Sequence, residues 1–188
     1  MKIFLTLFFL LFSSPVFTDD ISDFQIEGIS IGDSLLTYFS VEKIESGLKD
    51  WYPNNTFSYT EFSDYKIKDF DKLGFYFKPG DKELKIYSIA AIKFCKDDIQ
   101  ICYNLQSRME KKFEKISSNV NKYKDKIEYP YNENYGTGSN AIQTIYTLDN
   151  GNKVYIETKD WATDSKFTDN VSINIDTKIF NDWLASVS

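Results

Sequence analysis

The chain has 188 residues, of which 42% are hydrophobic, 17% aromatic and 27% charged, and 22 basic against 28 acidic side chains give a formal charge of -6. This composition is typical of a folded globular protein and excludes a disordered or collagen-like chain, while the negative charge disfavours nucleic acid as a partner. The sequence contains no histidine, which excludes the hydrolase and metalloenzyme sites that depend on an imidazole.

The first 18 residues have the pattern of a secretory signal peptide. A lysine precedes an apolar run over residues 3–12 that only Thr6 interrupts, and Val16 and Thr18 occupy the minus-three and minus-one positions of a cleavage site. The run is too short for a transmembrane helix, which needs about 20 apolar residues. We therefore expect removal of residues 1–18, a periplasmic or secreted location, no membrane span in the mature chain, and a single domain over residues 19–188.

The first part of the mature chain is predicted to form a short helical pair followed by strands. An extended segment over residues 26–31 leads into a turn, Asp33 can cap a first helix, and a second helical turn over residues 41–46 stops at Gly47. Period-two alternation then predicts strands over residues 57–62, 65–70, 73–78 and 83–94, the last with Leu84, Ile86, Ala90, Ile92 and Phe94 on one face.

Helical spacing replaces this alternation over residues 98–120, where Asp97 and Gln100 match a capping box. Further strands are predicted over residues 126–131, 141–148, 153–158 and 171–175, before a short closing helix over residues 179–187. We therefore expect an α+β fold: an antiparallel sheet of about seven strands with a long central helix packed on it, a short N-terminal helical pair and a short C-terminal helix. The order of elements hints at an internal duplication, although no residue-level repeat is visible.

Two overlapping motifs near the start of the mature chain match serine-hydrolase signatures. Gly28-Ile29-Ser30-Ile31-Gly32 has the G-x-S-x-G spacing, and Gly32-Asp33-Ser34-Leu35 reads like the GDSL block of secreted esterases. In both families a histidine accepts the proton of the serine, and this chain has none. We assign no catalytic residue and expect Ser30, Asp33 or Ser34 to satisfy free N–H groups of the turn and the helix that follows.

The same segment, Gly28-Ile29-Ser30-Ile31-Gly32-Asp33-Ser34-Leu35-Leu36, resembles the opening of small envelope proteins of the SmpA/OmlA and beta-lactamase-inhibitor-like group. In that group a helical pair leads into an antiparallel sheet, and the resemblance implies the same arrangement here. The lipid-bearing cysteine of SmpA/OmlA is missing. From residues 21–24 to residues 181–184, the chain also resembles uncharacterised exported proteins of marine alphaproteobacteria, which implies export but no known activity.

Residues 129–140 form a predicted loop rich in tyrosine, asparagine, glycine and serine. Such a mixture suits an adaptable recognition surface, because aromatic rings supply contact area and small polar groups supply hydrogen bonds. The candidate binding residues are Tyr129, Tyr131, Asn134 and Tyr135. The alternative is an ordinary connector between two strands.

Three aspartates that follow the last predicted hairpin, Asp160, Asp164 and Asp169, could supply oxygen ligands to calcium. The twelve-residue calcium loop with its central glycine and terminal glutamate is absent from this region. We therefore expect turn and capping roles for these side chains, and we assign no metal site and no cofactor.

Cys95 and Cys102 are the two cysteines of the sequence, in a chain that we expect to reach an oxidising compartment. We therefore expect a disulfide that connects the end of a strand to the first turns of the long helix. A redox role is the alternative, although the spacing is not Cys-x-x-Cys.

These features predict an exported, non-enzymatic protein that binds an unidentified protein or small ligand of the cell envelope. The alternative is a histidine-free hydrolase that uses carboxylates on envelope or extracellular polymers. A cleft that gathers two or more acids with perturbed pKa values would favour the hydrolase. An apolar or aromatic patch without such groups would favour binding.

Overall fold

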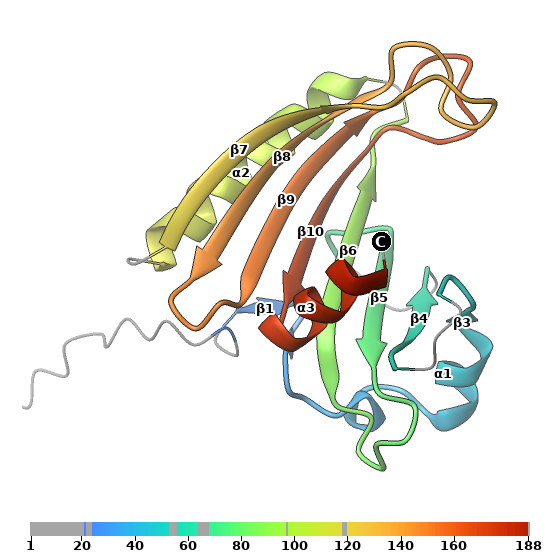
Figure 1. Cartoon of the computed structure of the whole chain (residues 1–188), viewed down its shortest axis with the longest axis vertical. Coiled ribbons are helices and arrows are strands. Elements are labelled where there is room, and N and C mark those ends of the chain that lie inside the picture. The colour runs from blue at the N-terminus through green and yellow to red at the C-terminus, as the bar shows by residue number, and fades with distance from the viewer. Residues whose placement is uncertain are drawn as a thin grey trace, which may run out of the picture.

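The computed structural model describes residues 21, 24–52, 56–63, 68–96, 98–117 and 120–187, so the predicted signal peptide lies outside the described residues. Within them, the main strands are β3 (Leu48–Lys49), β4 (Ser58–Phe62), β5 (Lys72–Phe77), β6 (Ile86–Phe94), β7 (Val120–Glu128), β8 (Asn140–Leu148), β9 (Lys153–Asp160) and β10 (Asn170–Asp176). They form one eight-stranded antiparallel sheet in the order β3-β4-β5-β6-β10-β9-β8-β7 (Figure 1). The α+β class is confirmed, with one strand more in this sheet than the expected seven.

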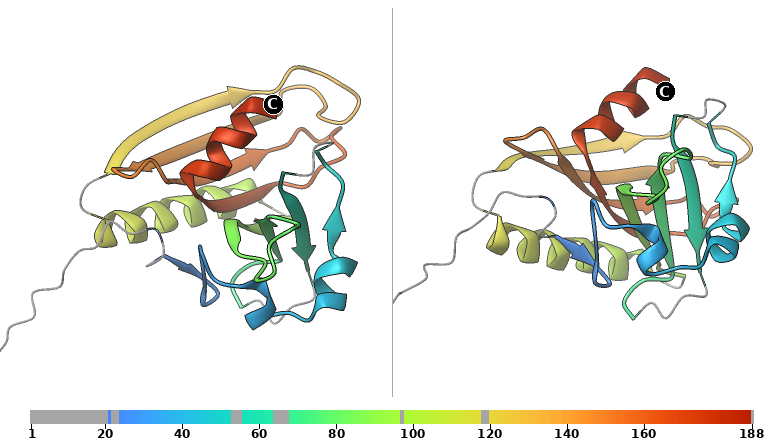
Figure 2. Two further views of the ribbon diagram at one scale, coloured as in Figure 1. Left: turned by 60° about the horizontal axis from the view of Figure 1, so that its bottom comes forward. Right: turned by 90° about the horizontal axis from the view of Figure 1, so that it is seen from below.

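Helical segments lie on both faces of this sheet. The long helix α2 (Ile99–Ile116) covers one face, and α3 (Lys178–Val187) lies on the opposite face (Figure 2). The N-terminal segment contains the hairpin β1 (Gln25–Ile26) and β2 (Ile29–Ser30), the short 3-10 helix η2 (Leu35–Thr37) and α1 (Val41–Ser46). None of the helices among the described residues is both long enough and apolar enough to cross a membrane.

The main core lies between the sheet and the layer formed by α2 and the N-terminal segment. The ring of Phe113 on α2 lies 4.8 Å from that of Phe24 and 4.6 Å from that of Tyr146 on β8. At the other end of the sheet, Phe39 stacks on Phe62 of β4 with ring centroids 4.3 Å apart. All five rings belong to one buried cluster, so the two ends of the sheet share a single core.

The strand order repeats along the chain. Strands β3 to β6 are neighbours in sequence order, strands β7 to β10 are neighbours in the same way, and the last strand of each set pairs with the other at the centre. The β6–β10 pairing runs from Phe94 opposite Asn170 to Ser88 opposite Asp176. The chain therefore consists of two halves with the same strand topology, which join through β6 and β10.

An irregularity in β6 changes which of its side chains face the core. Phe77 pairs with Ile86 and Tyr76 pairs with Ser88, so β6 contains one extra residue at this point. Strict alternation predicted Ile86 on the same face as Ala90. The prediction was wrong, because the extra residue turns Ile86 into the core while Ala90 lines the opposite face.

The first half also differs from the prediction at its strand boundaries. Residues 68–70 do not form the strand predicted over residues 65–70, and residues 64–67 lie outside the described residues. The strand predicted from residue 83 begins at Ile86, because Leu84 has a positive φ of 46° that a strand cannot contain.

Both ends of α2 differ from the prediction. Asp98 caps the helix by accepting a hydrogen bond of 2.8 Å from the Gln100 N–H, whereas Asp97 lies outside the described residues. Ser117 already has extended backbone, and Val120 starts β7 instead of continuing the helix. β7 pairs with β8 along its whole length and ends at Glu128, so the strand predicted over residues 126–131 was placed too late.

The predicted disulfide is confirmed. The sulfurs of Cys95 and Cys102 are 2.08 Å apart and the Cα atoms 5.9 Å apart. Both cysteines are buried against Val171 of β10. The bridge therefore connects the end of β6 to the start of α2 next to the junction of the two halves.

Candidate functional site

The loop predicted as a recognition surface packs against the segment that joins β9 to β10. Tyr129 stacks on Trp161 with ring centroids 4.9 Å apart, and Tyr135 lies 5.6 Å from the same ring. Phe167 completes this group at 4.9 Å from Trp161. Tyr131 does not take part in it and is 70% exposed. The structure thus brings Tyr129 and Tyr135 together, and leaves Tyr131 pointing outward.

Asn134, the fourth predicted binding residue, holds the two loops together. Its backbone oxygen accepts a hydrogen bond from the Lys166 N–H, and its side-chain oxygen accepts one from Lys166 Nζ, both at 3.0 Å. Nearby, Gly136 has a φ of +73°, and a Cβ there would lie 2.2 Å from Asp164 Oδ1. The loop is therefore fixed by specific contacts, and its role in recognition stays a prediction.

The serine motifs of the N-terminal segment form a turn and a cap. Ser34 caps η2 by accepting a hydrogen bond from the Leu36 N–H, so of the three candidates Ser30, Asp33 and Ser34 the cap is Ser34. Asp33 instead accepts a hydrogen bond of 2.9 Å from the Ser30 N–H. Ser30 is buried. Ser34 thus caps the local backbone, and the Ser30 N–H is satisfied by Asp33.

The three aspartates considered as calcium ligands each accept a hydrogen bond from a different part of the chain. Asp160 accepts a hydrogen bond from the Tyr103 hydroxyl, Asp164 accepts one from the Thr137 N–H, and Asp169 accepts one from the Trp161 N–H. No group of three or more histidine, cysteine, aspartate or glutamate side chains among the described residues could hold a metal ion.

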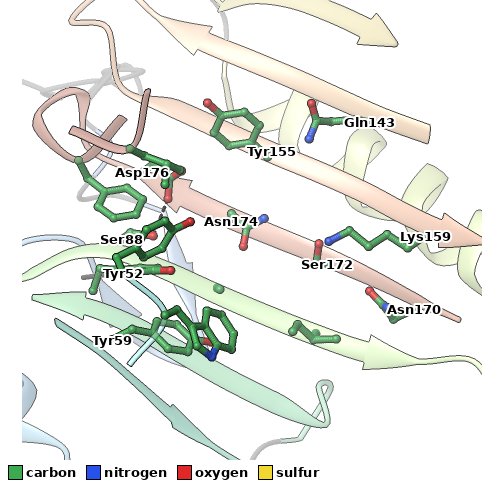
Figure 3. A pocket seen from close by; sticks show the side chains of 16 residues that line it. Tyr52, Tyr59, Ser88, Gln143, Tyr155, Lys159, Asn170, Ser172, Asn174 and Asp176 are labelled. Atoms are coloured by element: carbon green, nitrogen blue, oxygen red, sulfur yellow. Dashed lines mark hydrogen bonds between the residues drawn. The ribbon is translucent and has the colours of Figure 1, made fainter. Parts of the chain in front are cut away.

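A different part of the molecule contains a pocket. It has a volume of about 450 Å³ and lies over β6 and β10, on the sheet face opposite α2 (Figure 3). Its floor is made of small side chains from these central strands, among them Ser88, Ala90 and Ser172. Larger side chains from the neighbouring strands and from α3 rise around them. The pocket exists because the centre of this face carries small residues and its flanks carry aromatic ones.

One wall of the pocket is a row of aromatic rings. Trp51 stacks on Tyr59 with centroids 4.6 Å apart, Tyr59 lies 4.7 Å from Tyr76, and Tyr76 lies 4.4 Å from Phe180 of α3. The ring of Tyr59 lies directly over Gly74, where a Cβ would be 2.1 Å from the Tyr59 hydroxyl oxygen. Glycine at this position of β5 is therefore required for the row to form.

Asp176 lies at the end of the pocket next to α3, where β10 ends. It is 5% exposed, and Ser88 Oγ donates a hydrogen bond of 2.6 Å to its Oδ1. Burial raises the pKa of Asp176 to about 7, against the opposing effects of the Ser88 hydrogen bond and the more distant charge of Lys153. The charge of Asp176 in turn adds to the effect of burial in raising the pKa of Tyr155 to about 12.

Two lysines near the pocket form ion pairs with acids of the same sheet face. Lys159 lines the far end of the pocket and forms an ion pair of 3.2 Å with Glu157. Lys72 forms one of 2.8 Å with Glu61, beside the aromatic wall. Within the described residues, no ion pair reaches Asp176. The pocket therefore contains one acidic group whose charge is not directly compensated.

No family model, curated protein or solved structure matches this chain. The resemblances to the SmpA/OmlA and beta-lactamase-inhibitor-like group and to exported alphaproteobacterial proteins therefore stay predictions.

Sequence reasoning did not find the pocket, although one signal pointed to it. In β10, apolar Val171, Ile173 and Ile175 alternate with polar Ser172, Asn174 and Asp176. Such alternation is ordinarily attributed to a strand with one solvated face. Here β10 is central in the sheet, and its polar face forms the pocket floor.

Proposed function

We propose that the protein is an exported, non-enzymatic binding protein and that the pocket over β6 and β10 holds its ligand. The main support for the proposal is Asp176, a nearly buried carboxylate that lines the pocket beside a row of aromatic rings. A volume of about 450 Å³ suits a small organic molecule, because ligand pockets commonly measure about 300 to 1,000 Å³.

The cost of burying Asp176 supports a role beyond folding. A carboxylate removed from water is destabilising unless a cation or several hydrogen bonds compensate it. In the described residues Ser88 is the one side chain that donates to Asp176. Groups that cost stability concentrate at functional sites, because the ligand supplies the missing interactions.

The carboxylate-based hydrolase receives less support from this geometry. Hydrolysis of this type uses two acids, separated by about 5 to 10 Å in glycosidases. Asp176 is the one acid among the described residues that line the pocket. The nearest acid along the sheet face, Glu157, lies opposite Ser172, roughly 13 Å along β10 from Asp176, and is paired with Lys159.

The proposed export rests on the signal-peptide pattern and agrees with the disulfide between Cys95 and Cys102. A disulfide in a chain of this size is typical of an oxidising compartment, which fits the periplasm or the medium.

The experiment compares binding to the wild-type protein with binding to a variant whose pocket is filled. Ala90→Phe places a ring on the pocket floor, and Asn104→Phe places the same ring on the exposed surface of α2 as a control. Ligand-observed NMR with a panel of neutral, cationic and anionic fragments should show saturable binding to the wild type and to Asn104→Phe, and none to Ala90→Phe. Equal fragment binding by all three folded proteins, or no binding to any of them, would overturn the proposal.

A further inference from the structure

We infer that the ligand of this pocket is an organic cation, whose ammonium group lies beside Asp176 and whose organic body packs along the row formed by Tyr76, Tyr59 and Trp51. The inference rests on the proposed function and adds the chemical class of the ligand.

The charges around the pocket favour a cation. The pairs Glu157–Lys159 and Glu61–Lys72 are each neutral, which leaves Asp176 as the one charged residue among the described pocket-lining residues that forms no ion pair. An anionic ligand would be repelled by this carboxylate, and the charge of Lys153 only partly offsets that repulsion. A neutral ligand would leave the buried carboxylate uncompensated, whereas an ammonium group would supply the opposite charge that burial has removed.

Lys153 is the group that could already supply such a charge. It lies opposite Asp176 in the pairing of β9 with β10, and its charge lowers the pKa of Asp176. However, no Lys153–Asp176 ion pair is present within the 4.0 Å that such contacts require, and burial outweighs the attraction between them. A cationic ligand could therefore form the direct ion pair with Asp176 that Lys153 does not form.

The rings next to Asp176 favour an ammonium group over an inorganic cation. Tyr76 and Phe180 lie 4.4 Å apart at the Asp176 end of the pocket, and Tyr59 and Trp51 continue the row. Aromatic faces attract organic ammonium groups through their quadrupole, so a row of rings beside a carboxylate suits a ligand of this class. A divalent metal ion would instead favour several charged oxygen ligands, and Asp176 is the one acid among the described residues that line the pocket.

The surroundings of Asp176 also determine how binding depends on pH. The groups that face it are Ser88 from β6, Tyr76 from β5, and Lys153 and Tyr155 from β9. Burial and the carboxylate raise the pKa values of both tyrosines, so neither hydroxyl loses its proton near neutral pH. Asp176 is therefore the group that titrates in this range, and its ionised form, present above about pH 7, is the form that binds a cation.

The test uses pairs of probes that differ in charge and hardly in shape. Choline is compared with its neutral isostere dimethylbutanol, and benzylamine with benzyl alcohol, by calorimetric titration of the wild type, Asp176→Asn and Asp182→Asn. Asp182 is an exposed carboxylate on α3, so Asp182→Asn controls for the loss of one negative charge outside the pocket. For the wild type and Asp182→Asn we expect at least one cation to bind about tenfold or more tightly than its neutral partner, and to weaken about tenfold or more from about pH 8 to about pH 5. In Asp176→Asn both differences should disappear.

The outcomes separate this inference from the proposed function. If the neutral partners bind as well as the cations, or if Asp176→Asn keeps the preference, the cation assignment is wrong while the pocket remains a binding site. If no cation shows saturable binding but Ala90→Phe abolishes the binding of other fragments, the cation assignment is again wrong and the pocket is still a binding site. If Ala90→Phe changes the binding of no fragment at all, the proposed function itself fails.

Discussion

Ser88 Oγ donates a hydrogen bond of 2.6 Å to Asp176 Oδ1, and this bond joins the last strands of the two halves of the sheet. Ser88 directly follows the extra residue of β6, and Asp176 is the last residue of β10. The bond therefore lies both at the junction of the halves and at the bottom of the pocket.

Asp176 should make the stability of the protein depend on pH. Its pKa is about 7 in the folded protein, above the value of 3.8 expected for an unfolded chain, so the folded state binds the proton more tightly. Stability from this group is fully present below about pH 4 and is lost as the pH rises through about 7, by an amount on the order of a few kcal/mol. Asp176→Asn should lack this loss. Urea unfolding of wild type and variant at about pH 5 and pH 8 measures it.

The control for this measurement is Asp149→Asn, in the exposed turn between β8 and β9. It should shift the free energy of unfolding equally at both pH values. A difference between wild type and Asp176→Asn that stays constant from about pH 5 to pH 8 would contradict the prediction.

Removing the disulfide should destabilise the protein. The bridge closes a loop with a sequence separation of 7, for which the loss of chain entropy in the unfolded state corresponds to about 2 to 2.5 kcal/mol. Replacing Cys95 and Cys102 together by alanine should lower the free energy of unfolding by at least that amount, since both side chains are buried. Chemical denaturation of the double variant and the oxidised wild type gives the difference. Two alkylated thiols in the unreduced wild-type protein would show that the bridge does not form.

Ser34 should contribute to stability and not to chemistry. Its side chain caps η2, so Ser34→Ala should cost about 1 kcal/mol in thermal or urea unfolding. Ser107→Ala, on the exposed face of α2, should change stability little. Covalent labelling of Ser30 or Ser34 by a serine-reactive phosphonate would contradict this structural role and revive the hydrolase reading of the motif.

Tyr131 and Tyr135 should respond differently to substitution by alanine. Tyr135 contacts Trp161 and Phe167, so its loss should lower the free energy of unfolding by about 1 to 2 kcal/mol and change the fluorescence of Trp161. Tyr131 is 70% exposed, and its loss should leave both quantities nearly unchanged. If the loop is a recognition surface, Tyr131→Ala should weaken partner binding without affecting folding; equal destabilisation by the two substitutions would show that the loop is structural throughout.

The elements that sequence reasoning predicted well are those with local signals. Helix α1 ends at Ser46 and is followed by Gly47 as its C-cap, as the glycine in the sequence indicated. The hairpin between β8 and β9 forms at its Asn-Gly turn, where Gly151 has a φ of +83°. In each case the residues that determine the structure are neighbours in sequence.

The features that sequence reasoning missed depend on pairing between distant strands. The sequence of β7 lacks the alternation of a strand, because most of its side chains are exposed at the sheet edge. Its strand structure is apparent only from its pairing with β8. The pocket brings together Ser88 and Asp176, which are hydrogen-bonded across a sequence separation of 88. Neither the extra residue in β6 nor the central position of β10 has a local signal, so the polar face of β10 could not be distinguished from a solvated one.

The pairing of β6 with β10 also protects the protein from self-association. The outer strand β7 is a poor edge for pairing with a second chain, because it carries several charged side chains, among them Lys122, Lys124 and Lys126. The central strand β6 has the sequence Ile-Tyr-Ser-Ile-Ala-Ala-Ile-Lys-Phe, with a single charge near its end, and without β10 its backbone N–H and C=O groups would be unpaired on that side. A chain cleaved between the halves, or stalled during synthesis before β10 emerges, would therefore expose an unpaired β6 edge to the strands of other molecules. Pairing of β10 with β6 is the folding step that removes this edge and so lowers the tendency to aggregate.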